Sequence, residues 1–121
     1  MNKTAAENIF DPPYVAALAT ANRFLYSLQM HDQENALLLL TTAAKKTCSE
    51  DRLAMMFSPD STISYEIARG RKVKSGRYIF PVALFEIGSH HRWARPRYSQ
   101  ITVIKTADHD WAIEKLPWAA R

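Results

Sequence analysis

One carboxylate in this sequence, Glu86, is placed where it could serve as a general acid or base. It ends a row of apolar residues spaced two apart, namely Tyr78, Phe80, Val82 and Leu84. If this row is the inner face of a strand, burial would raise the pKa of the carboxyl toward neutrality, as acid–base catalysis requires. Pro81 argues against a regular row, because a proline within a strand favours a bulge or an edge. The favoured interpretation is therefore a solvated Glu86 near the strand end, or one paired with Arg95 or Arg97.

Three tyrosines could donate a hydrogen bond to a ligand. Tyr26 lies near the end of the first expected helix, and Tyr65 and Tyr98 lie in expected strands. Aromatic residues at such positions more often fill a core than take part in chemistry. Together with Glu86, these three make up the candidate ligand-binding set, and Glu86 and Tyr26 are the candidates for catalysis. No complete acid–base set can be assigned from the sequence, so a non-catalytic role is favoured.

Residues 88–98, GSHHRWARPRY, join two histidines to three arginines and two aromatic rings. Adjacent residues of a strand point to opposite faces, so His90 and His91 cannot readily share one metal ion. His31 and His109 are isolated in the sequence and lack a spacing typical of metal ligands. We expect neither a metal site nor a cofactor.

Trp93, Arg95 and Arg97 share one parity and form an outward row in the expected third strand. Tryptophan and arginine are enriched among the residues that dominate protein interfaces. The same row could instead be an exposed strand on which the arginine stems pack against the indole. The sequence leaves these two alternatives open.

The basic character of the chain belongs to its second half. The formal net charge is +4, and residues 1–60 hold five Lys/Arg and seven Asp/Glu, against eleven and five in residues 61–121. The cations gather in two groups, Arg69–Arg77 and Arg92–Arg97, which an up-and-down sheet would place at opposite ends. Two separate clusters make a poor footprint for a nucleic-acid backbone. We therefore expect no nucleic-acid partner.

The 121 residues have room for one domain, and 47% hydrophobic with 23% charged residues is a globular composition. Cys48 is the single cysteine, so an internal disulfide or a C-x-x-C motif is impossible. The N-terminus lacks the apolar core of a signal peptide, and no stretch is apolar over a membrane-spanning length. We expect one domain over 1–121, with 1–11 flexible, in a soluble cytoplasmic protein. A chain that had lost a leader or an anchor would look the same.

Three helices are expected in the first half. The first starts at Asp11, whose side chain can cap it, followed by Pro12, which gives up an amide that would lack a partner. It continues as an apolar stripe at steps of three and four, comprising Tyr14, Ala17, Leu18, Ala21, Phe24, Leu25 and Leu28. Asp32 caps a second helix that runs through Leu40. A capping box at 47–50, TCSE, starts the third.

From Ser61 onward the residues become β-branched and aromatic, separated by turn residues. We expect four strands, at about Thr62–Arg69, Arg77–Ile87, Trp93–Lys105 and Trp111–Leu116. The connections GRKVKSG, GSHHR and TADHD are short enough for antiparallel hairpins. Three N-terminal helices packed on a curved, mainly antiparallel four-stranded sheet make an α+β fold.

This order of elements resembles the nuclear transport factor 2-like superfamily, the cystatin-like α+β cones. The likeness rests on the first helix ending in FLYSL (24–28), the break at His31-Asp32, the leucine-rich second helix and the closing segment TADHDWAI (106–113). It covers the chain from about Pro12 to Trp118, and its motifs are specific to the fold rather than to an activity. The resemblance implies a sheet wrapped around the first helix, a conical cavity open at one end, and frequent homodimerisation through the outer face of the sheet.

Members of that superfamily include ketosteroid isomerases, scytalone dehydratases, polyketide cyclases, transport adaptors and assembly domains, so the fold alone supplies no function. We predict a homodimer that acts as a non-catalytic domain and binds a small apolar or aromatic ligand or another protein. Trp93, Arg95 and Arg97 would form the dimer face or the rim of the cavity. The alternative is an isomerase, dehydratase or cyclase that uses Glu86 and Tyr26, although the ketosteroid isomerase pattern of a tyrosine with two cavity carboxylates is incomplete. A third class, an assembly subunit of an envelope complex, would require an N-terminal anchor.

Overall fold

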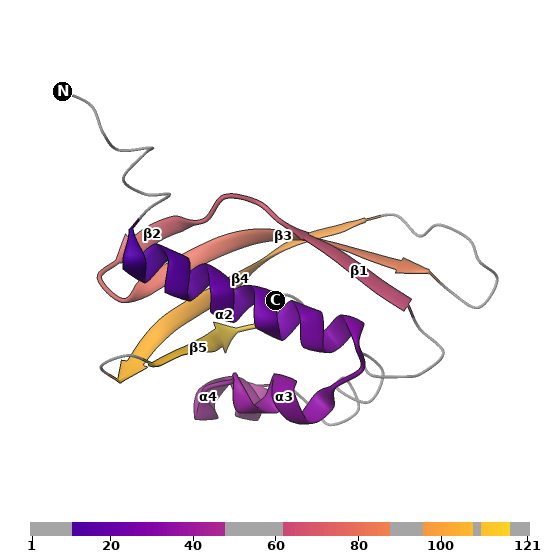
Figure 1. Cartoon of the computed structure of the whole chain (residues 1–121), viewed down its shortest axis with the longest axis horizontal. Helices are drawn as coiled ribbons and strands as arrows, with labels where there is room; N and C mark the ends of the chain where they lie inside the picture. The colour runs from indigo at the N-terminus through magenta and orange to yellow at the C-terminus, as the bar shows by residue number, and fades with distance from the viewer. Residues whose placement is uncertain (1–10, 48–61, 88–95, 108–109, 117–121) are drawn as a thin grey trace.

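The computed structural model describes residues 11–47, 62–87, 96–107 and 110–116, in which three helices precede five strands (Figure 1). The helices are α2 (Pro12–Gln29), α3 (Gln33–Leu38) and α4 (Thr42–Thr47), and none of the three is long and apolar enough to cross a membrane. The strands are β1 (Thr62–Ile67), β2 (Arg71–Lys74), β3 (Arg77–Ile87), β4 (Arg97–Ala107) and β5 (Asp110–Lys115). The α+β class that the order of elements predicts is confirmed.

The strands pair antiparallel in one curved sheet that wraps around α2 (Figure 1). The order is β1-β3-β4-β5, and β2 also pairs with β3. Because β4 takes up the other side of β3, β1 and β2 follow one another along a single side of it, separated by residues 68–70. The strand β3 is therefore paired along both of its sides.

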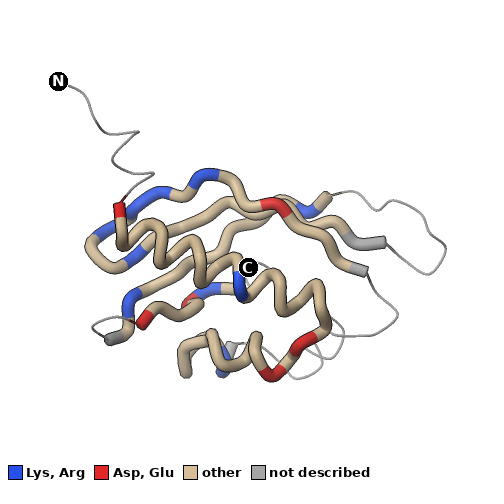
Figure 2. Tube along the Cα trace, viewed as in Figure 1, with Lys and Arg blue, Asp and Glu red and all other residues tan. Residues whose placement is uncertain are grey.

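Strand β2 lies inside the segment 70–76, which the sequence analysis treats as a hairpin connection. All four of its residues are exposed, and three of them are cations, so the segment lacks the alternation of apolar and polar residues by which a strand is recognised. It joins β3 through a tight turn at Ser75-Gly76, where Gly76 has a φ of 78° that glycine adopts at little cost. Figure 2 shows this edge of the sheet as a run of Lys and Arg.

Pro81 lies within β3 without shifting its register. Pairing with β4 runs unbroken from Arg77 to Leu84, and Pro81 stands opposite Gln100. The carbonyl of Pro81 accepts a hydrogen bond from the amide of Ala68 at 2.9 Å. Since the nitrogen and carbonyl of one strand residue point to the same side, the missing proline donor faces the gap between β1 and β2, where the ladder is interrupted. The alternation that the sequence suggested therefore holds along β3.

The core lies between α2 and the concave face of the sheet. The predicted stripe of α2 is buried at Tyr14, Ala17, Ala21, Phe24, Leu25 and Leu28, with Leu18 partly buried beside it. The sheet contributes buried residues that alternate along its strands, namely Ile63, Tyr78, Phe80, Val82, Leu84, Ile101, Val103 and Ile113. These two sets fix the position of α2 over the sheet.

Both ends of α2 are fixed by hydrogen bonds. The carboxylate of Asp11 accepts from the hydroxyl of Tyr78 at 3.2 Å and caps no described amide of α2, so the predicted side-chain cap is wrong and Asp11 ties the helix to β3. At the other end, the amides of His31 and Asp32 donate to the carbonyls of Leu28 and Ser27. This is a Schellman motif, and His31 occupies its left-handed position with a φ of 59°.

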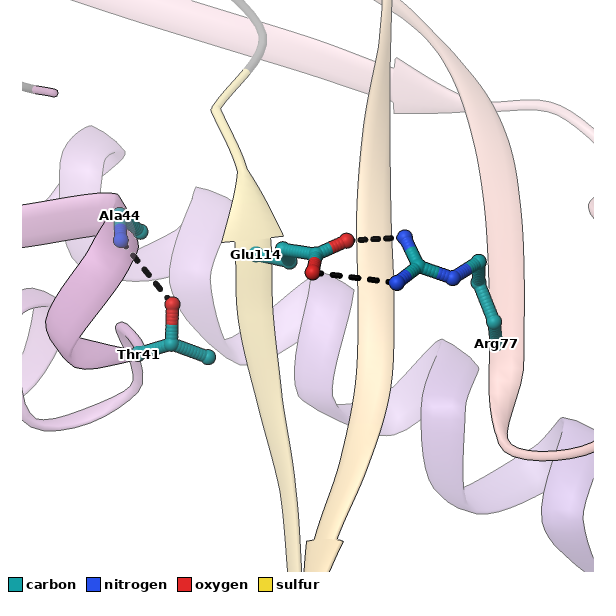
Figure 3. A network of polar contacts seen from close by, with 4 residues as sticks. All are labelled: Thr41, Ala44, Arg77 and Glu114. Atoms are coloured by element: carbon teal, nitrogen blue, oxygen red, sulfur yellow. Dashed lines mark hydrogen bonds and ion pairs between the residues drawn. The ribbon is translucent and has the colours of Figure 1, made fainter.

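The segment after α2 links the helices to the edge of the sheet. Asp32 caps α3 as predicted, because its carboxylate accepts from the amide of Asn35 at 3.2 Å. The helix ends before Leu40, since Leu39 and Thr41 bond the backbone of Ile113 in β5 at 2.7 Å and 3.0 Å. The hydroxyl of Thr41 then accepts from the amide of Ala44 at 3.0 Å (Figure 3). The helix predicted to start at residue 47 lies outside the described residues, apart from Thr47, which ends α4.

Candidate functional site

The candidate site lies where β1 faces the middle of α2. The hydroxyl of Tyr65 in β1 donates to Oδ1 of Asn22 in α2 at 2.8 Å. Burial raises the pKa of Tyr65, and the neighbouring Tyr26 raises this pKa further. The phenol of Tyr65 therefore keeps its proton to a higher pH than a free tyrosine does, and its hydrogen bond to Asn22 holds it against the helix.

Tyr26 lies one helical turn after Asn22, on the same side of α2. Its side chain is 53% exposed, and it is close enough to Tyr65 to affect the pKa of that residue. Two of the predicted ligand-binding residues, Tyr26 and Tyr65, are thus brought together. Asn22 was missed by the sequence analysis, although its spacing of four from Tyr26 on the polar side of the helix could have indicated it.

Tyr65 also belongs to a row of three residues across the concave face of the sheet. It pairs with Leu84 in β3, and Leu84 pairs with Arg97 in β4. The guanidinium-bearing side chain of Arg97 is exposed. The row therefore combines a phenol, an apolar side chain and a cation on the side of the sheet that faces α2.

The register of β4 gives Arg97 a different face from the outward one that the sequence analysis assigned. Arg97 has the same parity as Ile101 and Val103, which are fully buried against α2. The parity of these two apolar residues was the signal in the sequence that could have assigned Arg97 to the concave face. The other two members of the predicted interface row, Trp93 and Arg95, lie outside the described residues.

Tyr98 and Glu86 are the other two predicted ligand-binding residues. Tyr98 pairs with Ala83 on the outer face of the sheet and is 80% exposed, so it is not among the residues that face α2. Glu86 pairs with Ile63 in β1 and follows Leu84 on the concave parity of β3. The side chain of Glu86 lies outside the described part of the structure.

Tyrosines at the other end of the core have structural partners. Tyr78 contacts the rings of Tyr14 and Trp111, with centroids 5.9 Å and 5.8 Å apart. The hydroxyl of Tyr14 accepts from the amide of Gly70 at 3.0 Å. Burial raises the pKa of Tyr78, and its hydrogen bond to Asp11 and the charge of that carboxylate add to the effect. These rings hold the fold together, which leaves Tyr26 and Tyr65 as the better candidates for ligand contact.

An ion pair crosses the outer face of the sheet. Arg77 in β3 reaches over β4 and forms two hydrogen bonds with the carboxylate of Glu114 in β5, of which the Nη2–Oε2 bond is 3.1 Å long (Figure 3). Both side chains are half-buried, and such bidentate geometry strengthens an ion pair. Arg77 was grouped with the basic hairpin in the sequence analysis, whereas in the structure its charge is already neutralised.

The arrangement around Tyr26 and Tyr65 offers several groups that a ligand could contact. It offers phenol rings as apolar surface, and hydroxyl, amide and guanidinium groups as hydrogen-bonding partners for a ligand oxygen. Within residues 11–47, 62–87, 96–107 and 110–116, no three His, Cys, Asp or Glu side chains gather to hold a metal ion.

Known proteins share the fold of this chain but not its sequence. No protein-family model matches the sequence, and no curated protein matches it. A ketosteroid isomerase-like protein from Erwinia carotovora atroseptica is similar with a TM-score of 0.63 at 15% identity, over 87% of this chain and 93% of that chain. A domain of unknown function with a cystatin-like fold from Nostoc punctiforme gives 0.61 at 15% identity, over 80% and 70%.

An established enzyme is also among the similar structures. The Δ5-3-ketosteroid isomerase from Mycobacterium sp. matches with a TM-score of 0.60 at 12% identity, over 84% of this chain and 89% of that chain. Identities this low concern the fold and carry no activity across. The curved antiparallel sheet around α2, together with these likenesses, shows that the chain has the cystatin-like α+β fold.

Proposed function

We propose that the chain is a non-catalytic domain that binds a small organic ligand against Tyr26 and Tyr65. The observation that carries this proposal is the hydrogen bond from Tyr65 to Asn22, with the half-exposed ring of Tyr26 beside it. A phenol held in place next to an accessible one gives a rigid aromatic surface with few, fixed polar groups. Small-molecule sites share this composition.

Arg97 narrows the chemistry of the ligand. It stands in the row Tyr65–Leu84–Arg97 on the side of the sheet that faces α2, and it has no ionic partner among the described residues. A guanidinium favours carboxylate or another anionic oxygen. The ligand that fits has an aromatic or apolar body, for the tyrosine rings, and an oxygen that accepts hydrogen bonds.

Binding of 2-naphthoate and 2-naphthol, followed by the fluorescence of the probes, tests this site. Tyr26→Phe and Tyr65→Phe each remove a hydroxyl and keep the ring, so each should weaken naphthoate binding by about threefold to tenfold. Tyr98→Phe is the matched control, because the same change on the outer face should leave the Kd unaltered. Equal weakening by Tyr98→Phe, or no effect of the other two variants, would contradict the proposal.

The rival function is an isomerase, dehydratase or cyclase that uses Glu86 as its base and Tyr26 as its hydrogen-bond donor. It is supported by the fold shared with a ketosteroid isomerase and by the concave parity of Glu86 in β3. Conversion of a Δ5-3-ketosteroid to its conjugated enone, followed by ultraviolet absorption, measures one such reaction. Turnover that disappears in Glu86→Gln but persists in Tyr98→Phe would favour the enzyme over the binding domain.

A homodimer through the outer face of the sheet belongs to the same proposal. That face carries apolar residues from three strands, of which Tyr98 is 80% exposed and the others are Ile79, Pro81, Ala83, Phe85, Ile104 and Ala112. Apolar and aromatic residues of this kind are typical of dimer surfaces. Sedimentation equilibrium at tens of micromolar should give the mass of a dimer, and Tyr98→Asp should shift it to the monomer. A monomer for the unaltered chain would contradict this part of the proposal.

A further inference from the structure

The edge formed by β2 carries the densest positive charge in the described structure. Arg69, Arg71, Lys72 and Lys74 place four cations within six residues, and all four side chains are exposed. None of them forms an ion pair or a hydrogen bond through its side chain with a described residue. We call these four residues the basic edge. Figure 2 shows it along the side of the sheet where the chain turns from β2 into β3.

The carboxylates near this end of the sheet are mostly engaged elsewhere. Asp11 accepts a hydrogen bond from Tyr78, and Glu114 is paired with Arg77. Lys105 adds another exposed cation at this end of the sheet. Its amide donates to the carbonyl of Gly76 in the turn after β2, which places it beside the basic edge. Asp110 is the described carboxylate that remains without such a bond at this end. The positive field of the basic edge is therefore left open to a partner.

The backbone of β2 is also available for pairing. β2 pairs with β3 on one side, and no described strand pairs with its other side. The opposite margin of the sheet is different, since Leu39 and Thr41 occupy both the amide and the carbonyl of Ile113 in β5. An unpaired strand edge offers its N–H and C=O groups to an extended chain, which can add to the sheet as a further strand.

Charge complementarity decides what kind of chain this edge fits. We propose that the basic edge binds an extended acidic segment of a partner protein, which pairs with β2 and sets its carboxylates against the four cations. Lys72 stands opposite Tyr78 and Arg71 opposite Ile79, so cations lie on both faces of β2 and the partner can carry acidic residues at positions of either parity. Four strand residues span only about 13 Å, which suits a short peptide better than a nucleic-acid backbone.

Fluorescence anisotropy of labelled hexapeptides with the whole chain tests this proposal. The probes are alternating valine and glutamate, alternating proline and glutamate with the same charge, and alternating valine and lysine. At low salt the valine–glutamate peptide should bind with a Kd of roughly 10–100 µM, and the other two at least about tenfold more weakly, because proline lacks the strand donor and lysine has the wrong sign.

Paired charge reversals locate the binding surface. Lys72→Glu with Lys74→Glu should weaken binding of the valine–glutamate peptide by at least about tenfold. Lys45→Glu with Lys46→Glu makes the same change of charge on the exposed residues of α4 and should leave the Kd within about twofold. Circular dichroism of both variants checks that each is folded.

Several outcomes would overturn the proposal. Equal binding of the proline–glutamate peptide would show that charge alone acts and that no strand is added. No binding of the valine–glutamate peptide at millimolar concentration would show that the cations serve only to keep the edge soluble. Tighter, Lys72- and Lys74-dependent binding of a single-stranded oligonucleotide or of phosphatidylserine vesicles would assign the surface to a different class of partner.

Discussion

Tyr65 in β1 and Asn22 in α2 are joined by a hydrogen bond of 2.8 Å between the phenol and the side-chain carbonyl. The bond connects the first strand of the sheet to the middle of the long helix, so one pair of side chains belongs both to the fold and to the candidate site. The structural role and the binding role of such a residue can be distinguished by measuring both stability and ligand binding on the same variant.

Tyr65→Phe should lower the free energy of unfolding by about 1 kcal/mol, the net contribution of one hydrogen bond whose other partner stays in reach of water. Urea denaturation measures this change. The matched control is Tyr98→Phe, which removes an exposed hydroxyl on the outer face and should alter stability by less than about 0.5 kcal/mol. A loss above about 2 kcal/mol for Tyr65→Phe would mean that the ring itself, and not its hydroxyl, had been displaced.

His31→Gly should stabilise the protein. His31 closes α2 with a φ of 59°, a conformation that is unfavourable by about 1–2 kcal/mol for residues with a Cβ, while the added freedom of glycine in the unfolded chain offsets part of that gain. The expected increase in the free energy of unfolding is about 0.5–1 kcal/mol. His31→Ala removes the imidazole and keeps the Cβ, so an equal increase in that variant would contradict the explanation.

Gly70→Ala should be strongly destabilising. A Cβ at residue 70 would lie 2.3 Å from Cδ1 of Phe80 and 3.0 Å from the carbonyl oxygen of Ile79, so the ring or the backbone must move, at a loss of about 2–3 kcal/mol. In a Phe80→Leu background the same substitution should be less harmful, because the ring atoms it meets are gone. Thermal unfolding of the four proteins gives the coupling, and strict additivity would contradict the proposed clash.

Alkaline pH should weaken the fold through Tyr65 and Tyr78. The pKa of each phenol is raised above its usual value of 10.0, chiefly by burial, so the folded protein holds these protons more tightly than the unfolded chain does. The contribution of these two phenols to the free energy of unfolding is fully present below pH 10, and it is lost as the pH rises through their pKa values in the folded protein.

Urea denaturation between about pH 8 and pH 11 measures this loss, which should be smaller in Tyr65→Phe than in the unaltered chain. Comparing the two proteins cancels the titration of lysines, which is common to both. A steeper alkaline loss in Tyr65→Phe would contradict the assignment.

The fold was predictable from the sequence because its main elements carry strong periodic signals. The stripe from Tyr14 to Leu28 repeats at steps of three and four, and the alternation from Tyr78 to Leu84 repeats at steps of two, and both proved to be buried faces. Strand β2 gave no such signal, because its backbone pairs with β3 while all its side chains face water. Hydrophobic patterns report burial, so a strand without a buried face escapes them.

The candidate site was predictable only in part. Tyr26 and Tyr65 are brought together because Tyr26 lies on the side of α2 that faces β1, and Tyr65 lies on the side of β1 that faces α2. The hydrogen bond from Tyr65 to Asn22 depends on how α2 is rotated over β1, which a single sequence does not encode locally. The face of Arg97 follows from its parity in β4, which it shares with the buried Ile101 and Val103, whereas the outward face was predicted from the row that Arg97 forms with Trp93 and Arg95.

The segment that joins α3 to α4 has a consequence for how the protein stays in solution. By holding both backbone groups of Ile113, Leu39 and Thr41 leave β5 no free ladder position there for a second molecule to copy. If this segment were pulled away, the backbone groups of Ile113 would be free to pair with a strand of a second molecule. We therefore expect the short segment between α3 and α4 to reduce aggregation by covering this edge of β5, a role that its hydrophobic pattern alone does not indicate.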